Sequence, residues 1–464
     1  MKKISFTVIL LLFTVLVNGQ VFKEISIQEY LELVRKNNLE YAAQRLSLDI
    51  AEAELLSASV FNNPEIGFGY YNNEIHRMHM GTGAVWELKQ VFTPGRRSVA
   101  IKIAHTHKEI THALLIDFYR VLREKATLKW LEAVKNQEII EARKKSYKEQ
   151  IEMIHTDSLS RGSEIVNDLD ALQNRVETYN FYRSIAEAES EQYMLLVELT
   201  EYCGISGADT LITPERKNIW SNHIYDLQGL IDEALLNRWD LIAATKELDR
   251  SKLEVVASKR EKIPEFEAFI GYGCNSEVTN EMAPSPKHNG FEFGISIPIP
   301  LFDKKRGEIL KAATMQKEAD KRLKQAELTV KNEVVASYYA YINANKKLKL
   351  YSSAGITKYS KELLDKKKEE YYNGEIHLLE VLDARRVYDE IIESMYSAIY
   401  DKSMALVVLQ SAVGIWDILY KLPASAGTAS AEASTSEPPE SSASATPASA
   451  VTTAKTAGTS SAPR

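Results

Sequence analysis

Cysteine is almost absent from this chain, because Cys203 and Cys274 are the only two among its 464 residues. Secreted domains held together by disulfides carry many more cysteines, and structural zinc sites need them in closely spaced pairs. A glycine-rich phosphate loop and a nucleophile-elbow motif are also missing. The nearest approach to a metalloprotease helix, "HTHKEITH" at 105–112, has the wrong histidine spacing. We therefore predict that the protein is not an enzyme and uses no cofactor.

Long apolar runs and an excess of positive charge are missing as well. After the first twenty residues no run of about 18 apolar residues occurs, so no membrane-spanning helix is expected. Lysine and arginine number 57 against 64 aspartates and glutamates, which offers no basic stripe for a phosphate backbone. Nucleic acid is therefore not an expected partner. Because 45% of the residues are apolar, the chain can still bury a substantial core.

The two ends of the chain differ from the rest. Lys2 and Lys3 precede an apolar run at 4–17, and this plan of residues 1–20 is typical of a secretory signal peptide. Residues 421–464 consist almost only of Ala, Ser, Thr, Pro, Gly and Glu. A segment of that composition cannot bury a core, so the tail is predicted to be disordered. The signal peptide predicts that the protein is exported.

Between these ends the chain contains the same pattern twice, 200 residues apart. Residues 27–65 and 227–265 align without a gap, and "EYCGI" at 201–205 corresponds to "SAVGI" at 411–415. The identical pairs in the first alignment are Gln28/Gln228, Asn37/Asn237, Ala43/Ala243, Leu48/Leu248, Asp49/Asp249, Glu54/Glu254, Pro64/Pro264 and Glu65/Glu265. Each half is therefore predicted to be one structural unit, at 21–206 and 223–420, joined by a linker at 207–222.

The hydrophobic period changes in the same order within each half. Residues 27–62 and 227–262 are rich in Ala, Leu and Glu and stop before a proline, which predicts a helix in each. Apolar residues then alternate with polar or small ones, as in "FEFGISIPI" at 291–299, which indicates strands. The predicted strands are 66–72, 84–92, 265–273 and 291–299. They form two β-hairpins, at about 65–92 and 265–300.

A very long helical region follows each hairpin. Residues 96 to about 156 contain no proline or internal glycine. From Gly307 to about Tyr372 there is no proline, and Gly355 is the only internal glycine. At about 1.5 Å per residue these helices approach 90 Å, a length typical of coiled-coil packing. Short breaks at 157–164 and 371–375 precede a returning helix in each half. A soluble periplasmic coiled-coil scaffold would explain these helices, but it would leave the four alternating strands unexplained.

The four strands pose the problem of how their edges are paired. In lipid, unpaired N–H and C=O groups at a sheet edge would have no partner, and a spanning strand needs about 9 to 11 residues. Known barrels begin at about eight strands, so four strands cannot close alone. Two, three or four chains would supply about 8, 12 or 16 strands, and geometry does not choose among them. We predict a barrel built from several chains and continued by a helical tube.

On these patterns the chain resembles the TolC-like outer membrane efflux protein family over residues 27 to about 416. The resemblance is carried by the duplicated helix, by "ISIPIPLFDKKRGEI" at 295–309, and by "YYNGEIHLLEVLDARRVY" at 371–388 followed by "LQSAVGI" at 409–415. It implies a mixed α and β membrane protein: a homotrimer with a 12-stranded transmembrane β-barrel, four strands per chain, continued by an α-helical coiled-coil tunnel.

The same resemblance implies a location and partners. The barrel would lie in the lipid of the outer membrane and the helices in the periplasm. The expected partners are a periplasmic adaptor (membrane fusion) protein and an inner membrane efflux pump of the RND type. Members of the family serve as passive exit ducts for what such a pump delivers.

The resemblance further implies an aperture at the periplasmic end of the tunnel. The family's acidic positions fall on Glu380 and Asp383, with Asp168 as the equivalent in the first half, and its tyrosine falls on Tyr371. A threefold ring of carboxylates would concentrate cations. The family's basic partner is missing, because Ile376 occupies its place. The competing interpretation is that Glu380 and Asp383 are polar positions on a solvated helix face.

Histidine and methionine gather in the first hairpin loop, at His76, Met78, His79 and Met80. Imidazole suits zinc and copper(II), and thioethers suit copper(I), so these four are candidate metal-binding residues. They favour export of heavy-metal cations, in a copper or cobalt-zinc-cadmium branch of the family. Drug or organic-compound efflux and protein secretion are the alternatives. An exposed loop tip also accepts almost any polar sequence, so a loop without metal is the competing interpretation.

Overall fold

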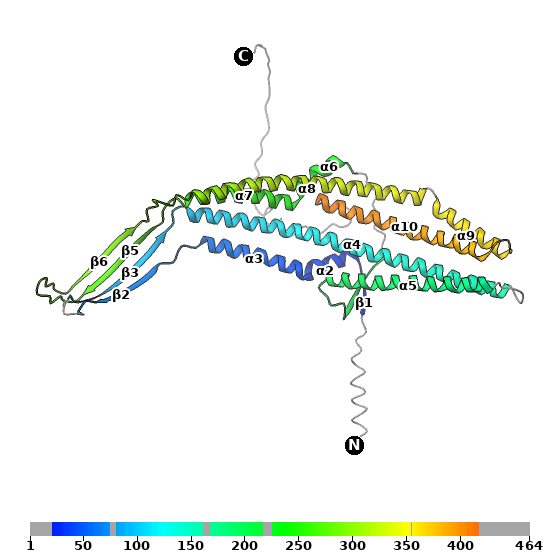
Figure 1. Cartoon of the computed structure of the whole chain (residues 1–464), viewed down its shortest axis with the longest axis horizontal. Helices are drawn as coiled ribbons and strands as arrows, with labels where there is room; N and C mark the ends of the chain where they lie inside the picture. Colours follow the sequence, from blue (N-terminus) through cyan, green and yellow to red (C-terminus); the bar gives the residue numbers. More distant parts are fainter. Residues whose placement is uncertain (1–20, 75–79, 161–167, 217–224, 354, 417–464) are drawn as a thin grey trace, which may run out of the picture. The chain divides into compact units, whose positions relative to one another are not determined.

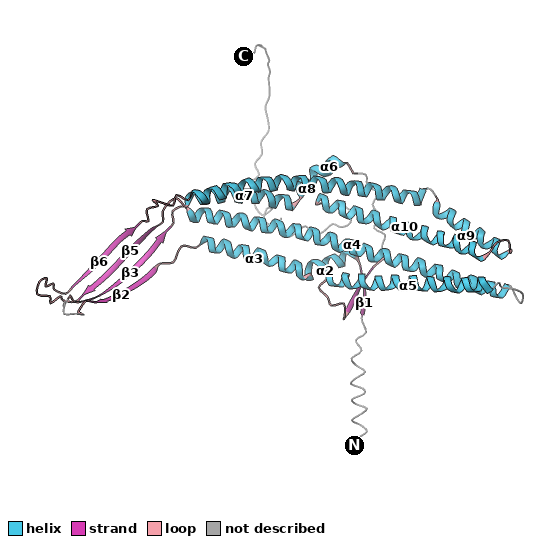
Figure 2. Cartoon of the chain, viewed as in Figure 1, coloured by secondary structure: helices cyan, strands magenta, loops and turns pink. Residues whose placement is uncertain are grey.

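The computed structural model describes residues 21–416 except 75–79, 161–167, 217–224 and 354, so the predicted signal peptide and tail lie outside it. Its elements in chain order are β1 (Val21–Ile25), α2 (Ile27–Asn37), α3 (Leu39–Ser59), β2 (Glu65–Asn72), β3 (Thr82–Phe92), α4 (Arg96–Ser160), α5 (Asp168–Tyr202), β4 (Thr210–Pro214), α6 (Leu227–Asn237), α7 (Trp239–Arg260), β5 (Phe266–Asn275), β6 (His288–Ser296), α8 (Arg306–Ser353), α9 (Ile356–Tyr372) and α10 (Leu378–Val413). Helices dominate, and four strands form one sheet (Figure 2). Among the described helices, none has the length and apolar character that crossing a membrane requires.

The four predicted strands pair as one antiparallel sheet in the order β2-β3-β5-β6. Its register places four aromatic side chains in one row across the strands: Phe68, Trp86, Tyr272 and Phe291. The rings of Phe68 and Trp86 lie 4.6 Å apart, and those of Tyr272 and Phe291 lie 4.9 Å apart. The alternation predicted for the strands is thus confirmed, and it gives the sheet one continuous apolar face.

The two faces of the sheet differ in chemistry. On the apolar face, large side chains remain exposed, with Trp86 at 54% and Phe293 at 84%. On the opposite face Glu87 forms an ion pair of 2.9 Å with Lys89, and Glu292 lies in the same row as Glu87. Within the described residues of one chain, the apolar face is exposed and the outer edges of β2 and β6 have no neighbouring strand.

Strand β6 ends at Ser296, three residues before the predicted limit at 299. Pro298 and Pro300 follow, and a proline has no amide hydrogen to donate to a neighbouring strand. The apolar alternation continues through this proline segment, but the strand pairing does not.

The two helices predicted at 27–62 and 227–262 are each broken once, at equivalent positions. Asn38 ends α2 and begins α3, because its Oδ1 accepts from the Tyr41 amide at 2.9 Å while its Nδ2 donates to the Tyr202 carbonyl at 3.0 Å. Arg238 stands at the second break, where its Nη1 donates to the Ala412 carbonyl at 3.0 Å. The breaks therefore depend on partners more than 160 residues away, which the local pattern does not contain.

Two glycines end the returning helices against these breaks. Gly204 follows α5 at φ 66°, and Gly414 follows α10 at φ 82°. A Cβ at Gly204 would lie 2.3 Å from the Asn37 carbonyl oxygen, and one at Gly414 would lie 3.4 Å from the Asn237 oxygen. Both glycines thus supply a left-handed cap, and Gly204 also permits the close approach of two backbones.

Two further departures from the sequence predictions concern the middle of the chain. The predicted linker 207–222 contains β4, which pairs in parallel with β1 and buries Leu211 and Ile212. The predicted helix 307–372 is divided into α8 and α9 at Gly355, whose φ of 63° lies in the left-handed region. In β4, tertiary burial overrides the linker-like composition of the segment. At Gly355, the backbone preference of glycine for the left-handed region interrupts the helical pattern.

Candidate functional site at the turn between α9 and α10

The turn between α9 and α10 lies at the end of α4 that is remote from the sheet (Figure 1). Strand β3 ends just before α4 begins at Arg96, whereas Met153 of α4 packs in one cluster with the turn. The residues between these two points of α4 span roughly 85 Å of helix. Gly374, at φ 78°, reverses the chain between α9 and α10. The predicted break at 371–375 is thus confirmed as a helical-hairpin turn.

Tyr371 lies in the core of this turn. It is 1% exposed and packs with Leu364, Leu378 and Val381, and its ring lies 5.9 Å from that of Tyr372. The structure places Tyr371 at the turn, and its role at an aperture stays a prediction. Within one chain, its aromatic body holds α9 against α10.

Glu380 has a basic partner that the sequence prediction missed. Lys367 Nζ lies 2.9 Å from Glu380 Oε2 and 3.1 Å from Glu370 Oε2. The hydrogen bond to Glu380 is the main cause that raises the pKa of Lys367. Lys367 precedes the turn on α9, whereas the family pattern expects a basic residue after the glycine. A cation is therefore present beside Glu380, but it comes from the other arm of the hairpin.

Asp383 is exposed and pairs with Arg386 three residues later, at 2.5 Å. Both residues line a groove of about 650 Å³ between α5 and α10, together with apolar side chains such as Leu172 and Leu379. Glu380 and Asp383 thus occupy the first turns of one helix, but each has its own cationic partner. Asp168 is the first residue of α5, and its side chain lies outside what the structure describes.

A polar network between α4 and α10 holds the hairpin in place. Arg385 is 2% exposed and donates to the Ser146 carbonyl at 2.7 Å and to Glu149 Oε2 at 2.6 Å. The Ser146 hydroxyl donates to Asp389 Oδ1 at 2.5 Å. The sequence prediction missed this network. A possible signal was Arg385, a charged residue two positions after Asp383 on the apolar face of α10.

A second arginine extends the network along the same two helices. Arg143 makes a two-pronged contact with Glu393, at 2.7 and 2.9 Å, and its Nη1 donates to the Ser184 carbonyl of α5 at 2.8 Å. Two parallel hydrogen bonds between a guanidinium and a carboxylate set the relative orientation of the two groups and also neutralise their charges. Arg143 therefore joins three helices, α4, α5 and α10.

The network gives its two central carboxyl groups opposite pKa shifts. Partial burial favours the protonated form of Glu149, but the hydrogen bond and charge of Arg385 outweigh it and hold the pKa of Glu149 below its usual range. Burial raises the pKa of Asp389, and the Ser146 hydroxyl only partly offsets this. Its Oδ2 is buried without a hydrogen-bond partner among the described residues. At this end of the hairpin, Arg385 therefore stabilises the ionised form of Glu149, whereas burial disfavours the ionised form of Asp389.

The candidate metal-binding loop is described only in part. His76, Met78 and His79 lie outside the described residues, and Met80 is 45% exposed. In the second hairpin, Met282 is 96% exposed and His288 Nε2 lies 3.0 Å from Asn275 Nδ2. Across the described part of the chain, no group of three or more His, Cys, Asp or Glu side chains is arranged to hold a metal ion. The metal-binding role of this loop stays a prediction.

Comparisons with known proteins agree with this architecture. Residues 230–414 match the family described as "Outer membrane efflux protein". The cobalt-zinc-cadmium resistance protein CzcC of Cupriavidus metallidurans is 22% identical over 306 residues, 64% of this chain and 67% of that relative. The outer membrane protein TolC of Vibrio cholerae is 25% identical over 302 residues, 62% of this chain and 66% of that relative. Each of these matches covers about two thirds of the relative's length.

The fold is also found in a solved structure. The chain superposes on a crystal structure of CusC with a TM-score of 0.66, and the match covers 86% of this chain and 94% of that one at 16% identity. At this identity the likeness establishes the fold alone. Nearly the whole of that solved chain therefore shares the combination of a strand sheet with long helical hairpins.

Proposed function

We propose that this chain is a member of the outer membrane efflux protein family and the passive outer membrane exit duct of a tripartite efflux system. The observation that carries the proposal is the four-stranded sheet, with its continuous apolar face and unpaired edges on β2 and β6. Lipid can cover such a face, but it cannot satisfy the backbone groups of an open edge. The edges therefore need partner strands from further copies of the chain.

Three copies would solve this problem by closing a 12-stranded barrel. The strands contain 8, 11, 10 and 9 residues, close to the length that spans a membrane at a tilt. The charged face with Glu87 and Glu292 would then line the lumen. The helices would continue the barrel as a periplasmic tunnel, and Tyr371, Glu380, Asp383 and Asp168 would lie near its aperture.

The similarity to known efflux proteins supports a proposal for the partners and the substrate. The proposed partners are a periplasmic adaptor and an inner membrane pump of the RND type. The similarity to a cobalt-zinc-cadmium resistance protein supports heavy-metal cations as the exported substrate. The similarity to TolC leaves efflux of organic compounds and protein secretion as the alternatives.

Membrane fractionation and gel mobility test the location and the assembly. We expect the full-length protein in the outer membrane fraction, and an oligomer on a denaturing gel that becomes a single chain on heating. A soluble periplasmic monomer would instead support the coiled-coil scaffold.

A deletion strain tests the substrate. We expect loss of the gene to lower tolerance to copper or to cobalt, zinc and cadmium, and the wild-type gene to restore it. Unchanged metal tolerance with increased drug sensitivity would exclude the metal proposal and favour organic substrates.

A further inference from the structure

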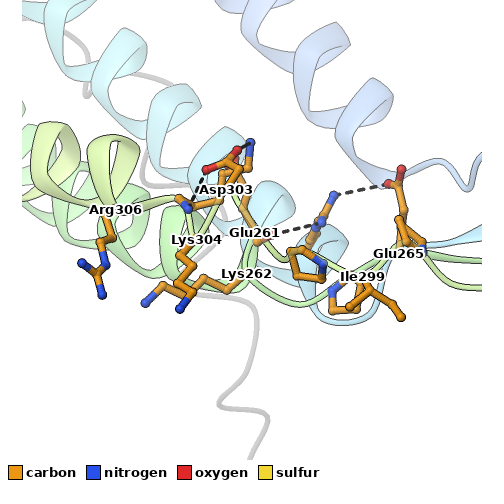
Figure 3. Close-up of a pocket in the computed structure, with 12 residues that line it drawn as sticks. Glu261, Lys262, Glu265, Ile299, Asp303, Lys304 and Arg306 are labelled. Carbon is orange, nitrogen blue, oxygen red and sulfur yellow. Dashed lines mark hydrogen bonds and ion pairs between the residues drawn. The ribbon is translucent and has the colours of Figure 1, made fainter.

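A charged groove lies where the strands meet the long helices (Figure 3). Its volume is about 540 Å³, and it is formed by the start of α4, the segment between α7 and β5, and the segment between β6 and α8. Its charged lining residues are Arg96, Lys262, Lys304, Lys305 and Arg306 with Glu261, Glu265 and Asp303. The lining thus has a net charge of +2, although the whole chain carries −7.

Part of this positive charge is already paired. Arg96 Nη1 lies 3.4 Å from Glu265 Oε2, and Lys305 Nζ lies 3.0 Å from Asp303 Oδ2. For Lys262, Lys304 and Arg306, by contrast, the described residues provide no carboxylate within ion-pair distance. These three side chains are exposed, and Figure 3 shows them extending on the same side of the groove. They are therefore available to an anion from outside the chain.

The backbone at this place carries an unusual conformation. Lys305 is the only described residue other than glycine with a positive φ, at 53°. Its amide is held by Asp303 Oδ1 at 2.8 Å. A left-handed conformation is unfavourable for a residue that carries a side chain, and such strain tends to persist at functional positions. Three successive cations, Lys304 to Arg306, also stand at the start of α8, where the helix dipole disfavours positive charge.

The groove also adjoins the apolar face that the proposed barrel turns to lipid. The stacked rings of Phe92 and Phe266, 5.1 Å apart, mark the ends of β3 and β5 at this level. Beyond β6 the apolar residues continue as Ile299, Leu301 and Phe302, which are 76%, 68% and 98% exposed. Ile299 lines the groove itself. Aromatic side chains commonly mark the interface at the rim of a membrane barrel, so the groove lies at the height of lipid headgroups.

We propose that this groove binds the phosphate headgroup of an anionic phospholipid in the periplasmic leaflet of the outer membrane. Lys262, Lys304 and Arg306 would contact the phosphate, while Ile299, Leu301 and Phe302 contact the acyl chains. A free anion would gain nothing from the exposed apolar residues, and a zwitterionic lipid would gain little from the excess charge. The inference rests on the outer membrane location proposed above.

Lipid retention measured by native mass spectrometry tests this site. The full-length protein is reconstituted in phosphatidylethanolamine containing phosphatidylglycerol. The number of molecules of each lipid that remain bound to each oligomer is then measured. A triple variant, Lys262→Gln, Lys304→Gln and Arg306→Gln, is compared with a matched triple variant on α8, Lys311→Gln, Lys317→Gln and Lys321→Gln. We expect the groove variant to lose the preference for phosphatidylglycerol by about tenfold or more, since each cation near a membrane surface adds to the attraction for anionic lipid. The α8 variant should keep it.

The outcomes separate the lipid site from its premise. An equal loss in both triple variants, no preference in the wild type, or removal of the preference by inorganic phosphate would overturn the lipid site. Fractionation of the wild-type protein is performed in parallel. A wild-type protein absent from the outer membrane would overturn the proposed function, whereas a correctly located oligomer without lipid preference would overturn the lipid site alone.

Discussion

Arg385 Nη2 lies 2.6 Å from Glu149 Oε2, and this contact joins the beginning of α10 to α4 at the end remote from the sheet. The arginine is almost fully buried, whereas its neighbour Arg386 is exposed and, among the described residues, forms its ion pair with Asp383 on its own helix. Two adjacent arginines therefore have different physical roles. Arg385 restrains the position of the hairpin, and Arg386 belongs to its surface.

Replacing Arg385 should loosen the hairpin turn. Arg385→Gln removes a buried charge, and the ion pair that Glu149 then keeps among the described residues is the longer one to Lys368, at 3.7 Å. We expect a local loss of about 1 to 3 kcal/mol, seen as faster hydrogen exchange in residues 371–393. The matched Arg386→Gln variant should change exchange by less than about 0.5 kcal/mol, because exposed pairs contribute little. Equal effects of the two substitutions would contradict a special role for Arg385.

The raised pKa of Asp389 predicts a pH dependence in the same region. The folded chain binds this proton more tightly than the unfolded chain, whose aspartate has its ordinary pKa near 3.8. The folded state therefore loses stability as the pH rises from that value through the raised pKa, and the loss is complete above it. Asp389→Asn cannot ionise and keeps an oxygen for the Ser146 hydroxyl. We expect its hydrogen-exchange protection to match the wild type near pH 4 and to exceed it increasingly toward neutral pH, whereas a constant difference would contradict the burial of the charge.

Much of this architecture could be predicted from the sequence because it depends on periodicity. The alternation in "FEFGISIPI" is local, and the sheet register places Phe291, Phe293 and Ile295 on one face. The position of the turn near Gly374 was likewise predictable, since a glycine and its polar neighbours interrupt a long helical pattern.

The contacts that fix the site were not predictable, because they join distant parts of the chain. Arg385 and Glu149 are 236 residues apart, and Asn38 and Tyr202 are 164 apart. Lys367 pairs with Glu380 only because the turn between them places α9 beside α10. No local pattern distinguishes these side chains from the many other charged residues on solvated helix faces.

The two glycine caps should respond differently to the same substitution. Alanine at either Gly204 or Gly414 would be forced to a positive φ, which costs about 1 to 2 kcal/mol. At Gly204 the new methyl group would also collide with the Asn37 carbonyl, 2.3 Å away, whereas at Gly414 the nearest carbonyl is at 3.4 Å. We expect Gly204→Ala to lower the midpoint of denaturant unfolding more than Gly414→Ala does. The reverse order would show that the contact between Gly204 and Asn37 is easily relaxed.

Cysteines at the two edges of the sheet should reveal how the copies of the chain assemble. Gly69 on β2 and Gly290 on β6 lie in the same row of the sheet, and added side chains there would meet no atoms within 4 Å. In a Cys274→Ser background, the double variant Gly69→Cys with Gly290→Cys should give dimers and trimers with a flexible bifunctional maleimide long enough to span the register stagger that strand tilt imposes between copies in a closed barrel. Each single variant should remain almost entirely a single chain on a denaturing gel. Efficient cross-linking of a single variant would contradict pairing of β2 with β6 between copies.

The charges at the proposed aperture should set the ion selectivity of the channel in opposite directions. Glu380→Gln or Asp383→Asn would remove three negative charges from a trimer and lower the preference for cations in a planar bilayer. Lys367 lies 2.9 Å from Glu380 and offsets its charge, so Lys367→Gln should raise that preference. Glu390→Gln is the matched control, because Glu390 is an exposed carboxylate farther along α10. Reversal potentials measured in a salt gradient report the change. If Glu380→Gln and Lys367→Gln shifted them in the same direction, the aperture would not be at this turn.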